Sequence, residues 1–598
     1  MFAYYVIPFC AGVVALLSIC SIKFIKWIQR LDKHQTITLK KNILSNKIFH
    51  SIWEIIREGL LHIRISKHHP LLGYMHRSLA FGWFLLILVG FIQTMFAYPN
   101  GHPFYVSIFF NYFEPRATHI QHHEFDPLMA HIMDGLLIYV LSGLTLAMIK
   151  SVWSKPLGMK RTTKLNLTDR IAKFSLWAIF PLRLLAESST SAIYGNGGFL
   201  VSSIGSAFSS IGITSTIFEH NCWFFYSLAL GTFFCLMPFS RYMHIFTEML
   251  LIILRNWGVS ETDKKTGYTY IELSACSRCG ICIDRCPINK HLGDTTIQGV
   301  YMLQTIRNKD LWNKAENIAN NCMMCDQCAV ECPVGIDLST IRTQVRASYN
   351  KDIDHTPAYE YLNNVHPFNA IGRIAYFGGC MSHLTPGITN AMETIFTAAG
   401  QKYWYIDKDR TICCGRPLRQ QGLTHQANEL KRKNSELIKK SGATMLVTSC
   451  PICYQSFKKE YNLKIPVLHH SEYIESLIRN NIISVNRSKS RVTYHDPCEL
   501  GRGCGVYEQP RNILKETNIL VGTQEEREKS ICCGYNLGNL SITNQQQASI
   551  RNAAISNLTE PSPDVIATAC PMCKKALSRG TETPVKDIAE IVVKHLKS

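Results

Sequence analysis

The chain has 598 residues, 23 cysteines and a formal net charge of +19. At about 100–200 residues per domain, this length predicts several domains. The basic excess comes with no nucleic-acid-binding motif and no basic stripe interleaved with aromatic residues, so we expect no nucleic-acid partner. Long apolar runs lie before residue 255 and most cysteines lie after it, which indicates two unlike halves.

Five apolar runs are long enough to cross a bilayer, which takes about 20 predominantly apolar residues. They lie at 4–24, 76–97, 128–149, 172–193 and 222–253. The fourth run is the most polar, because it contains Arg183 and Glu187. These two residues are four apart on one helix face, so we expect an ion pair, with a quinone or proton site as the alternative. No basic region precedes the first run, so a signal peptide is not predicted.

The distribution of lysine and arginine in the loops predicts the orientation in the membrane. The loops after the first and third runs are rich in both residues, whereas 98–127 and 194–221 contain only Arg116. We therefore expect an inner-membrane protein with its N-terminus outside and its cysteine-rich half in the cytoplasm. Because thiols are kept reduced there, the cysteine clusters indicate metal sites rather than disulfides.

Two cysteine runs in the second half have the spacing C-x2-C-x2-C-x3-C-P of bacterial two-cluster ferredoxins. In that arrangement the fourth cysteine of each run ligates the cluster of the other run. The first cubane [4Fe–4S] cluster is therefore assigned to Cys276, Cys279, Cys282 and Cys332. The second is assigned to Cys322, Cys325, Cys328 and Cys286. Zinc also takes four thiolates and is the alternative.

Beyond residue 370 the chain repeats itself with a period of about 119 residues. Each unit has a single cysteine, an adjacent pair before a glycine, and a C-x2-C motif. The first set is Cys380, Cys413, Cys414, Cys450 and Cys453, and the second is Cys498, Cys532, Cys533, Cys570 and Cys573. Strand-like segments that end at cysteines alternate with helical ones, which predicts α/β units with the cysteines at the carboxyl ends of the strands.

Five thiolates per unit exceed the four that a cubane or a tetrahedral zinc needs. The pattern resembles the CCG, or cysteine-rich, domain of heterodisulfide reductases and of related glycerol-3-phosphate, glycolate, lactate and succinate-type dehydrogenase subunits. The resemblance implies one noncubane [4Fe–4S] cluster per unit, with Cys413, Cys414, Cys532 and Cys533 as the catalytic cysteines. Zinc in one repeat is the alternative. Cys504 lies outside the pattern, as either a small packing residue or a substrate-facing thiol.

Histidine inside an apolar run is unusual. The phrases "LLGYMHRSLAFGWFLLILVG" and "FFCLMPFSRYMH" resemble the cytochrome b subunits of heterodisulfide reductase and the nitrate reductase gamma family. Two-heme members carry a second histidine in each of these two spans, where this chain has Leu86 and Tyr226. The resemblance therefore implies one heme b, held by His76 and His244 on the cytoplasmic side. Histidines without heme are the alternative.

Other histidines are assigned less specific roles. His131 with Asp134 is expected to be a further ligand or a proton-relay pair. Solvated side chains are expected for most of the loop and span-edge histidines, which are His62, His68, His69, His119, His122, His123 and His220.

The predicted fold is multidomain. It has an all-α membrane bundle of five transmembrane helices (1–257), an α-rich two-cluster ferredoxin domain (265–350) and a duplicated α/β CCG domain (370–480 and 490–598). We expect an oxidoreductase that transfers electrons between a membrane quinone and a cytoplasmic flavoprotein or dehydrogenase subunit, because the chain has no flavin motif of its own. A disulfide reductase and a redox-sensing membrane protein are the alternatives.

Overall fold

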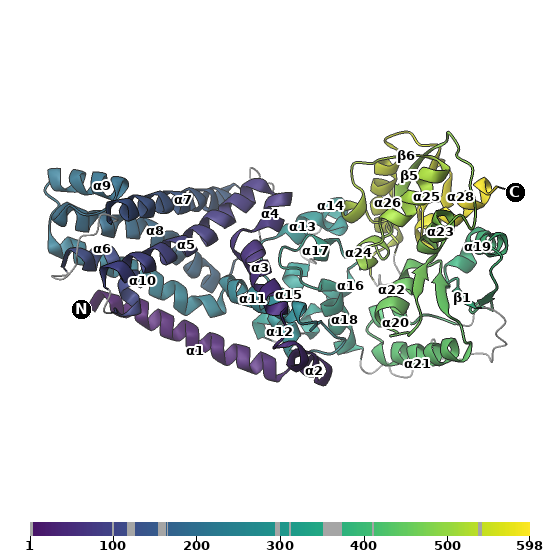
Figure 1. Cartoon of the computed structure of the whole chain (residues 1–598), viewed down its shortest axis with the longest axis horizontal. Helices are drawn as coiled ribbons and strands as arrows, with labels where there is room; N and C mark the ends of the chain where they lie inside the picture. The colour runs from purple at the N-terminus through teal and green to yellow at the C-terminus, as the bar shows by residue number, and fades with distance from the viewer. Residues whose placement is uncertain are drawn as a thin grey trace. The chain divides into compact units, whose positions relative to one another are not determined.

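The computed structural model describes residues 4–98, 101–116, 126–153, 163, 165–293, 299–309, 312–350, 373–409, 412–535 and 541–597. The chain divides into two compact units, Met1–Gly280 and Ile281–Ser598. The first unit is helical, and the second combines short helices with two small sheets (Figure 1). Three of the histidines expected to be solvated lie outside the described residues; they are His119, His122 and His123.

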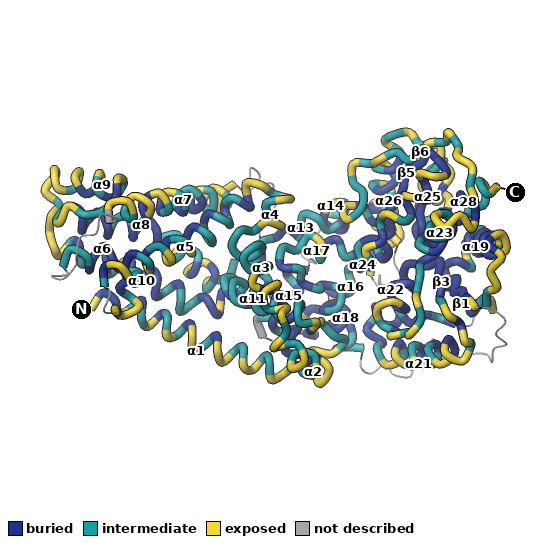
Figure 2. Tube along the Cα trace, viewed as in Figure 1, coloured by how far each residue is buried: buried dark blue, intermediate teal, exposed yellow. Residues whose placement is uncertain are grey.

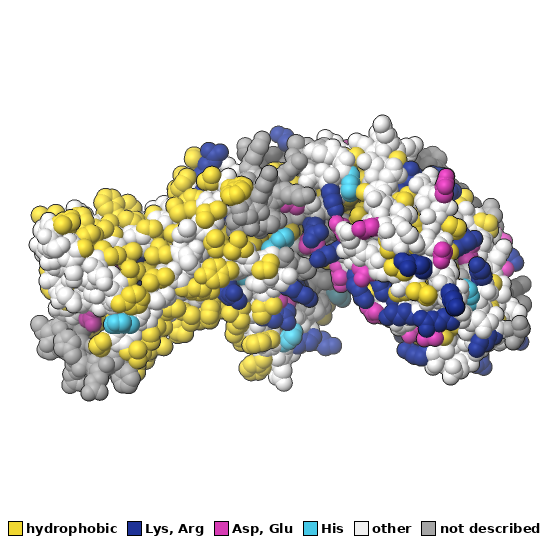
Figure 3. Space-filling view, turned by 90° about the horizontal axis from the view of Figure 1, so that it is seen from above, with side chains coloured by type: hydrophobic (Ala, Val, Ile, Leu, Met, Phe, Trp, Pro, Cys, Tyr) yellow, Lys and Arg dark blue, Asp and Glu magenta, His cyan; other side chains and the backbone are white. Residues whose placement is uncertain are grey.

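Long helices packed side by side dominate the described part of the first unit (Figure 1). They are α1 (Ile7–Gln29), α5 (Pro70–Ala97), α7 (Asp126–Val152), α8 (Leu167–Tyr194) and α10 (Thr216–Leu236). Among the described residues, four segments are long and apolar enough to cross a membrane, namely Tyr4–Gln29, Pro70–Ala97, Pro127–Val152 and Thr216–Phe239. Apolar side chains cover much of the outer face of the bundle (Figure 3), and Val14 and Leu17 of α1 are 64% and 62% exposed. Such a surface is compatible with contact to lipid.

Helix α8 contains the predicted fourth span but is not among those four segments, so a five-span bundle is not confirmed. The side chain of Asn166 caps its start by accepting from Asp169 N (2.8 Å). Asp169 also accepts from Arg241 N beyond the end of α10 (2.7 Å), while Thr190 donates to Glu219 near the start of α10 (2.6 Å). Helices α8 and α10 therefore run antiparallel along the length of the bundle.

The prediction of one continuous span over 222–253 is wrong. Helix α10 ends at Leu236, and two 3-10 turns follow, at Met237–Phe239 and Arg241–Met243. Pro238 lacks the N–H that would continue the helical ladder, and the Ser240 side chain caps the second turn. His244 therefore begins a separate helix, α11 (His244–Asn256), beyond the apolar span.

Shorter elements complete the first unit. They are η1 (Tyr4–Val6), α2 (Lys33–Asn42), α3 (Lys47–Glu54), η2 (Ile55–Leu60), α4 (Ile63–His68), η3 (Phe104–Ser107), α6 (Phe110–Phe113), η4 (Glu114–Arg116), α9 (Phe199–Ser210) and α12 (Gly267–Ala275). Side chains of α2 fix the chain beyond α11, because Gln35 donates to Ser260 O (2.7 Å) and Asn42 donates to Trp257 O (2.9 Å).

The second unit begins with short helices, in agreement with an α-rich ferredoxin segment. They are α13 (Ile281–Arg285), α14 (Pro287–Leu292), α15 (Gly299–Lys309), η8 (Asn313–Ala315), α16 (Glu316–Asn320), α17 (Gln327–Val330) and α18 (Leu338–Tyr349). Pro287 opens α14 directly after Cys286, where its fixed φ suits a first helical turn. The buried guanidinium of Arg346 joins this segment to the first repeat by donating to Ala319 O (2.8 Å) and Gln420 O (2.6 Å).

Each repeat contains a four-stranded parallel sheet, in the orders β2-β1-β3-β4 and β6-β5-β7-β8. The first comprises β1 (Ile374–Phe377), β2 (Tyr403–Tyr405), β3 (Met445–Thr448) and β4 (Val467–His469). The second comprises β5 (Arg491–His495), β6 (Ile519–Val521), β7 (Val565–Thr568) and β8 (Val585–Asp587). The central strands β1 and β3 are buried (Figure 2), as parallel sheets covered by helices require. The predicted duplicated α/β fold is confirmed.

The helices that flank the sheets follow the strands in the same order in both repeats. In the first repeat they are η10 (Ser382–Leu384), α19 (Pro386–Ala398), α20 (Arg416–Gln420), α21 (Thr424–Lys440), α22 (Pro451–Lys459) and α23 (His470–Arg479). In the second they are α24 (Gly501–Cys504), α25 (Glu508–Thr517), η11 (Arg527–Lys529), α26 (Asn544–Thr559), α27 (Pro571–Leu577) and α28 (Ile588–His595). Capping boxes begin α23, α26 and α28, which shows that these boundaries are encoded locally.

Candidate metal centres

The five cysteines of the first repeat lie together at the carboxyl edge of its sheet. Cys380 follows β1 and Cys450 follows β3. Cys413 hydrogen-bonds to Cys414, and Cys453 hydrogen-bonds to both Cys414 and Cys450. Cys380 lies within electrostatic range of Cys450 and Cys414. The structure therefore brings together the set that the repeat pattern groups.

The glycine after each cysteine pair accounts for the geometry of the CCG motif. Gly415 and Gly534 have φ values of +82° and +77°, a region that favours glycine. A Cβ on Gly534 would lie 2.4 Å from Gln547 O. In the first repeat, Tyr461 fixes the pair by donating to Cys414 O (2.8 Å). The backbone thus turns sharply after the pair and directs both thiols to one place.

The second repeat gathers its cysteines in the same way. Cys573 donates to Cys533 with an Sγ–Sγ distance of 3.5 Å. Cys532 hydrogen-bonds to Cys498 and Cys533, and Cys570 hydrogen-bonds to Cys573. All of these except Cys498 are buried. Each repeat thus offers five adjacent sulfur ligands.

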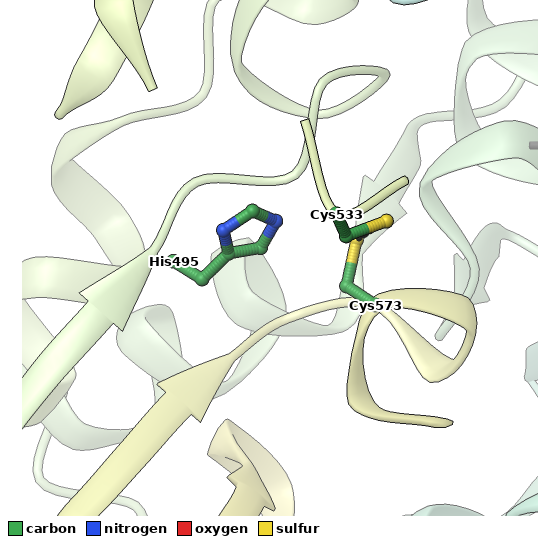
Figure 4. A group of neighbouring side chains, drawn as sticks. All are labelled: His495, Cys533 and Cys573. Carbon is green, nitrogen blue, oxygen red and sulfur yellow. Dashed lines mark hydrogen bonds between the residues drawn. The ribbon is translucent and has the colours of Figure 1, made fainter. Parts of the chain in front are cut away.

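His495 joins the second set and was missed from the sequence, although it lies in the string "HDPC". It is the last residue of β5, and Figure 4 shows its ring beside the sulfurs of Cys533 and Cys573. The three potential ligand atoms lie within 4.8 Å of one another, so the ring of His495 is placed beside the sulfur ligands of this repeat. Its position at a strand end, three residues before a cysteine, is a signal that could have found it.

The second cysteine of each pair differs in pKa from the cysteines around it. Hydrogen bonds from Cys413 and Cys453 hold the pKa of Cys414 well below its ordinary value, and those from Cys532 and Cys573 do the same for Cys533. Cys380 is the exposed member of the first set. Several buried thiols in contact can all ionise only beside a positive counter-charge, which metal ions supply. The donor set therefore fits an iron–sulfur group.

A cavity in the second unit is lined by the four cysteines assigned to the second cubane, namely Cys286, Cys322, Cys325 and Cys328. Cys286 belongs to the first ferredoxin run and the other three to the second run, so the cavity has the crossed composition that the spacing predicts. Burial raises the pKa of Cys286 to about 12 and also raises that of Cys328. These thiols too need a positive counter-charge to ionise.

The four cysteines assigned to the first cubane are divided between the two units, so their grouping stays a prediction; they are Cys276 and Cys279 in the first unit, and Cys282 and Cys332 in the second. The loop in the first unit is anchored firmly. Arg278 is 3% exposed and forms an ion pair with Asp169 at the start of α8. Thr163 donates to Arg278 O (2.7 Å).

The second ferredoxin run contacts the second repeat. Cys325 accepts a hydrogen bond from Cys532, which lowers the pKa of Cys325 to about 6. Arg502 donates through Nε to Cys325 O (2.7 Å) and through Nη1 to Ser530 O (2.8 Å). Its Nη2 is buried without a hydrogen-bond partner among the described residues. No spacing in the sequence indicates this contact, because Arg502 belongs to no motif.

His76 and His244 lie within electrostatic range of one another in the first unit. Their Nδ1 atoms lie 2.9 Å from Leu72 O and 2.7 Å from Arg241 O. A backbone carbonyl on one ring nitrogen is the usual way to orient a metal-binding histidine. The structure also places His62 beside His76, because their ring centroids lie 5.5 Å apart. Burial lowers the pKa of His62 to about 4, so this half-buried histidine is an exception among those that are mostly expected to be solvated.

Two polar pairs were singled out in the apolar runs. Arg183 and Glu187 form the expected ion pair (2.8 Å), and their side chains are 11% and 5% exposed. Asp134 instead accepts from the backbone N–H groups of Leu200 (2.7 Å) and Val201 (3.1 Å) at the start of α9. This cap accounts for the buried carboxylate of Asp134 without a proton relay.

Cys504 lies at the end of α24, outside both sets of five. Burial raises its pKa to about 11, which disfavours a reactive thiolate. This agrees with a packing role.

Comparison with known families accounts for both kinds of cysteine motif. Residues 374–458 and 492–578 each match the cysteine-rich domain CCG, and residues 272–336 match the 4Fe-4S dicluster domain. The chain therefore carries a 4Fe-4S dicluster domain and two CCG domains. These assignments support [4Fe–4S] clusters in this protein.

Related proteins are oxidoreductases. The D subunit of dihydromethanophenazine:CoB–CoM heterodisulfide reductase from Methanosarcina acetivorans is 27% identical over 55% of this chain and 94% of the relative. EtfAB:quinone oxidoreductase of Syntrophomonas wolfei is 22% identical over 92% of each chain. The B subunit of fumarate reductase (CoM/CoB) from Methanothermobacter marburgensis is 26% identical over 51% of this chain and 67% of the relative. The comparisons support an iron–sulfur oxidoreductase.

Proposed function

We propose that this protein is a membrane-bound oxidoreductase that transfers electrons between a cytoplasmic flavoprotein, such as electron-transfer flavoprotein, and a membrane quinone. The observation that carries the proposal is the similarity to EtfAB:quinone oxidoreductase, because it covers 92% of both chains and so includes the long helices. The similarity to the D subunit of heterodisulfide reductase covers 55% of this chain. The apolar outer face of α1 adds support for membrane attachment.

The proposed cofactors are two cubane and two noncubane [4Fe–4S] clusters on the cysteine sets described above, with zinc in one repeat as the alternative. When bound, such clusters supply one-electron transfer. The chain's own residues supply thiolate ligands and exclude water from them. The hydrogen bond between Cys325 and Cys532 supports a close approach of the second cubane to the second repeat.

Heme b is part of the same proposal, and His76 and His244 are the residues that would bind its iron. The two carbonyl contacts would hold both imidazoles in a ligating orientation. Lys150 lies within electrostatic range of both His76 and Cys279, so the histidines and the first ferredoxin run share one end of the helical unit. That proximity supports transfer between a heme and the first cubane.

The proposed topology has five crossings, an outside N-terminus and cytoplasmic iron–sulfur domains. The antiparallel packing of α8 on α10 supports a fifth crossing by α8, since α8 extends along the whole apolar helix. The pairing of Arg183 with Glu187 lowers the cost of placing this helix in a membrane.

The test is a quinone-reduction assay with the full chain, purified without oxygen in detergent. Chemically reduced electron-transfer flavoprotein is the donor and a short-chain naphthoquinone is the acceptor. We expect turnover that needs both partners and falls at least tenfold in Cys328→Ser, which removes an assigned ligand of the second cubane. Cys504→Ser is the matched control and should retain full activity. Turnover that is unchanged in Cys328→Ser would contradict the proposal.

Disulfide reduction is a second candidate, favoured by the two complete five-cysteine sets and by the likeness to the D subunit of heterodisulfide reductase. In that case Cys413, Cys414, Cys532 and Cys533 would act at the substrate. Addition of the coenzyme M–coenzyme B heterodisulfide to the dithionite-reduced protein should then change the paramagnetic resonance spectrum, because the reduced clusters would supply the electrons that cleave the disulfide. An unchanged spectrum would leave the quinone-linked function as the remaining candidate.

A further inference from the structure

The two repeats are alike in their cysteines and differ in the residues around them. Phe377 and His495 are equivalent, because each ends the first strand of its sheet, lies three residues before the single cysteine and pairs in register with a threonine of the neighbouring strand, Thr448 or Thr568. Phe377 is buried against Phe457, with ring centroids 4.9 Å apart. His495 instead places a ring nitrogen within 4.8 Å of the sulfur of Cys533. Only the second repeat has a hydrogen-bonding side chain at this position.

A second substitution lies four residues after the single cysteine. The first repeat has Leu384 there, and its side chain is largely exposed. The second repeat has Arg502, which lies within electrostatic range of Cys498 and Cys532. Within the described part of the chain, the hydrogen bonds of its guanidinium go to carbonyl oxygens, and Nη2 is buried without a partner. This positive charge is therefore available to the sulfur ligands of the second repeat.

Charges near the first repeat are more nearly balanced. Asp407 lies within electrostatic range of Cys380. Arg416 follows the first cysteine pair and lies within electrostatic range of Cys414, but Glu460 (2.8 Å) and Glu499 (2.9 Å) both pair with it and offset its charge. In the second repeat, Asp496 lies two residues before Cys498, and Arg511 pairs with it at 2.6 and 2.7 Å.

We propose that the two repeats hold their clusters at different reduction potentials, and that His495 and Arg502 make the second repeat the easier one to reduce. The inference rests on the proposed function, because it takes each repeat to bind a cluster. Reduction adds one negative charge, so hydrogen-bond donors to sulfur and nearby positive charges favour the reduced form. Both devices are present in the second repeat, and the first has a phenyl ring and an aliphatic side chain in their places.

The position of Arg502 also predicts which repeat receives an electron first. The same guanidinium that faces Cys498 and Cys532 also donates to the backbone of Cys325 in the second ferredoxin run. An electron that arrives through the ferredoxin segment would therefore meet the more easily reduced repeat first. His495 and Arg502 are positioning residues in this scheme.

The test is an anaerobic redox titration of the full chain with dithionite, followed by paramagnetic resonance after iron has been counted. We expect two distinct midpoint potentials for the repeats in the natural protein. His495→Phe and Arg502→Leu install the residues of the first repeat. Each should lower the higher potential by about 59 mV, which corresponds to a tenfold change in the one-electron equilibrium constant. The double variant should bring the two potentials together.

Two further variants keep the test valid if His495→Phe folds poorly. Phe377→His should raise the lower potential, and Arg491→Leu should shift neither, because it removes an arginine from the opposite end of β5. With histidine labelled by nitrogen-15, the natural protein should show a nitrogen coupling that His495→Phe loses. A full iron count with unshifted potentials in His495→Phe and Arg502→Leu would overturn this inference alone. Repeats that contain no iron would overturn the proposed clusters and this inference together.

Discussion

The helical bundle and the cysteine-rich repeats bury polar groups in opposite ways. In the described part of the bundle, several buried charges have partners within the protein. Glu219 is fully buried, and it accepts from Arg116 (2.5 Å) and Thr190 (2.6 Å). Arg183 and Glu187 pair at 2.8 Å on one turn of α8. These contacts balance the buried charges with other groups of the protein itself.

In the repeats, the buried sulfur atoms contact mainly one another. Cys533 accepts from Cys573 at 3.5 Å, and its other neighbours include Cys532 and His495. Such a group can lose several protons only when a cation joins it. The bundle therefore contains buried ion pairs that the chain itself supplies, whereas we expect the stability of the repeats to depend on a bound metal group. Four predictions test this difference.

The largest effect should follow from removing a thiolate in a repeat. Cys533→Ser should lose the iron of the second repeat, about four atoms per chain, because it removes the cysteine whose pKa is held lowest in that set. Iron analysis and paramagnetic resonance measure the loss. Cys504→Ser lies outside both sets and serves as the control, since it should keep all of its iron. Equal iron content in Cys533→Ser and Cys504→Ser would contradict the expected dependence of the repeats on a bound metal group.

Breaking a charge pair in the bundle should cost less, and the loss should be recoverable. Arg183→Met leaves Glu187 buried without its partner, so we expect a loss of about 3–5 kcal/mol in the free energy of unfolding. The double variant Arg183→Met/Glu187→Leu should regain most of that loss, because it removes both charges. Thermal unfolding in detergent, followed by circular dichroism, compares the three proteins. A double variant as unstable as the single one would show that the pair has a role beyond charge balance.

A smaller effect should follow from a methyl group at the turn after a cysteine pair. Gly534→Ala places a Cβ 2.4 Å from Gln547 O, and its φ of +77° adds about 1–3 kcal/mol of strain. Gly400→Ala is the control, because its φ is +63° but nothing lies within 4 Å of the added atom. Iron content should fall in Gly534→Ala and stay constant in Gly400→Ala. The same iron content in both would mean that the turn tolerates the shift.

The smallest effect concerns pH. Burial holds the pKa of His469 well below its ordinary value, so this histidine stays neutral in the folded protein. The unfolded chain binds a proton near pH 6.5, so the contribution to stability is present above that pH and is lost as pH falls. At pH 5 the loss is about 2 kcal/mol. An asparagine side chain does not titrate. His469→Asn should therefore remove the contribution of His469 to the pH dependence of the free energy of unfolding, while it keeps the N-cap of α23. Unfolding titrations at pH 5 and 7 measure the difference, and equal slopes would contradict it.

The cysteines could be placed from the sequence because cluster ligation imposes fixed spacings. Strand ends next to Cys380 and Cys450 followed from β-branched segments of the right length, and the structure has β1 and β3 there. The end of the last apolar span could not be predicted from hydropathy alone, because apolar residues recur beyond Pro238, around Ser240, Arg241 and His244, while the backbone turns. His495 and Arg502 reach the cysteines through strand register and tertiary packing. The place of His495, three residues before Cys498, is visible in the sequence, whereas no spacing indicates Arg502.

The cavity that combines Cys286 with Cys322, Cys325 and Cys328 has a consequence for biosynthesis. When the first ferredoxin run leaves the ribosome, its fourth thiol belongs to a site whose other members have not yet been translated. A cluster at that site, as proposed, could be inserted only after α14 to α17 have been synthesised and have folded back together. Truncation anywhere between these two runs would leave an orphaned thiol and a target for degradation.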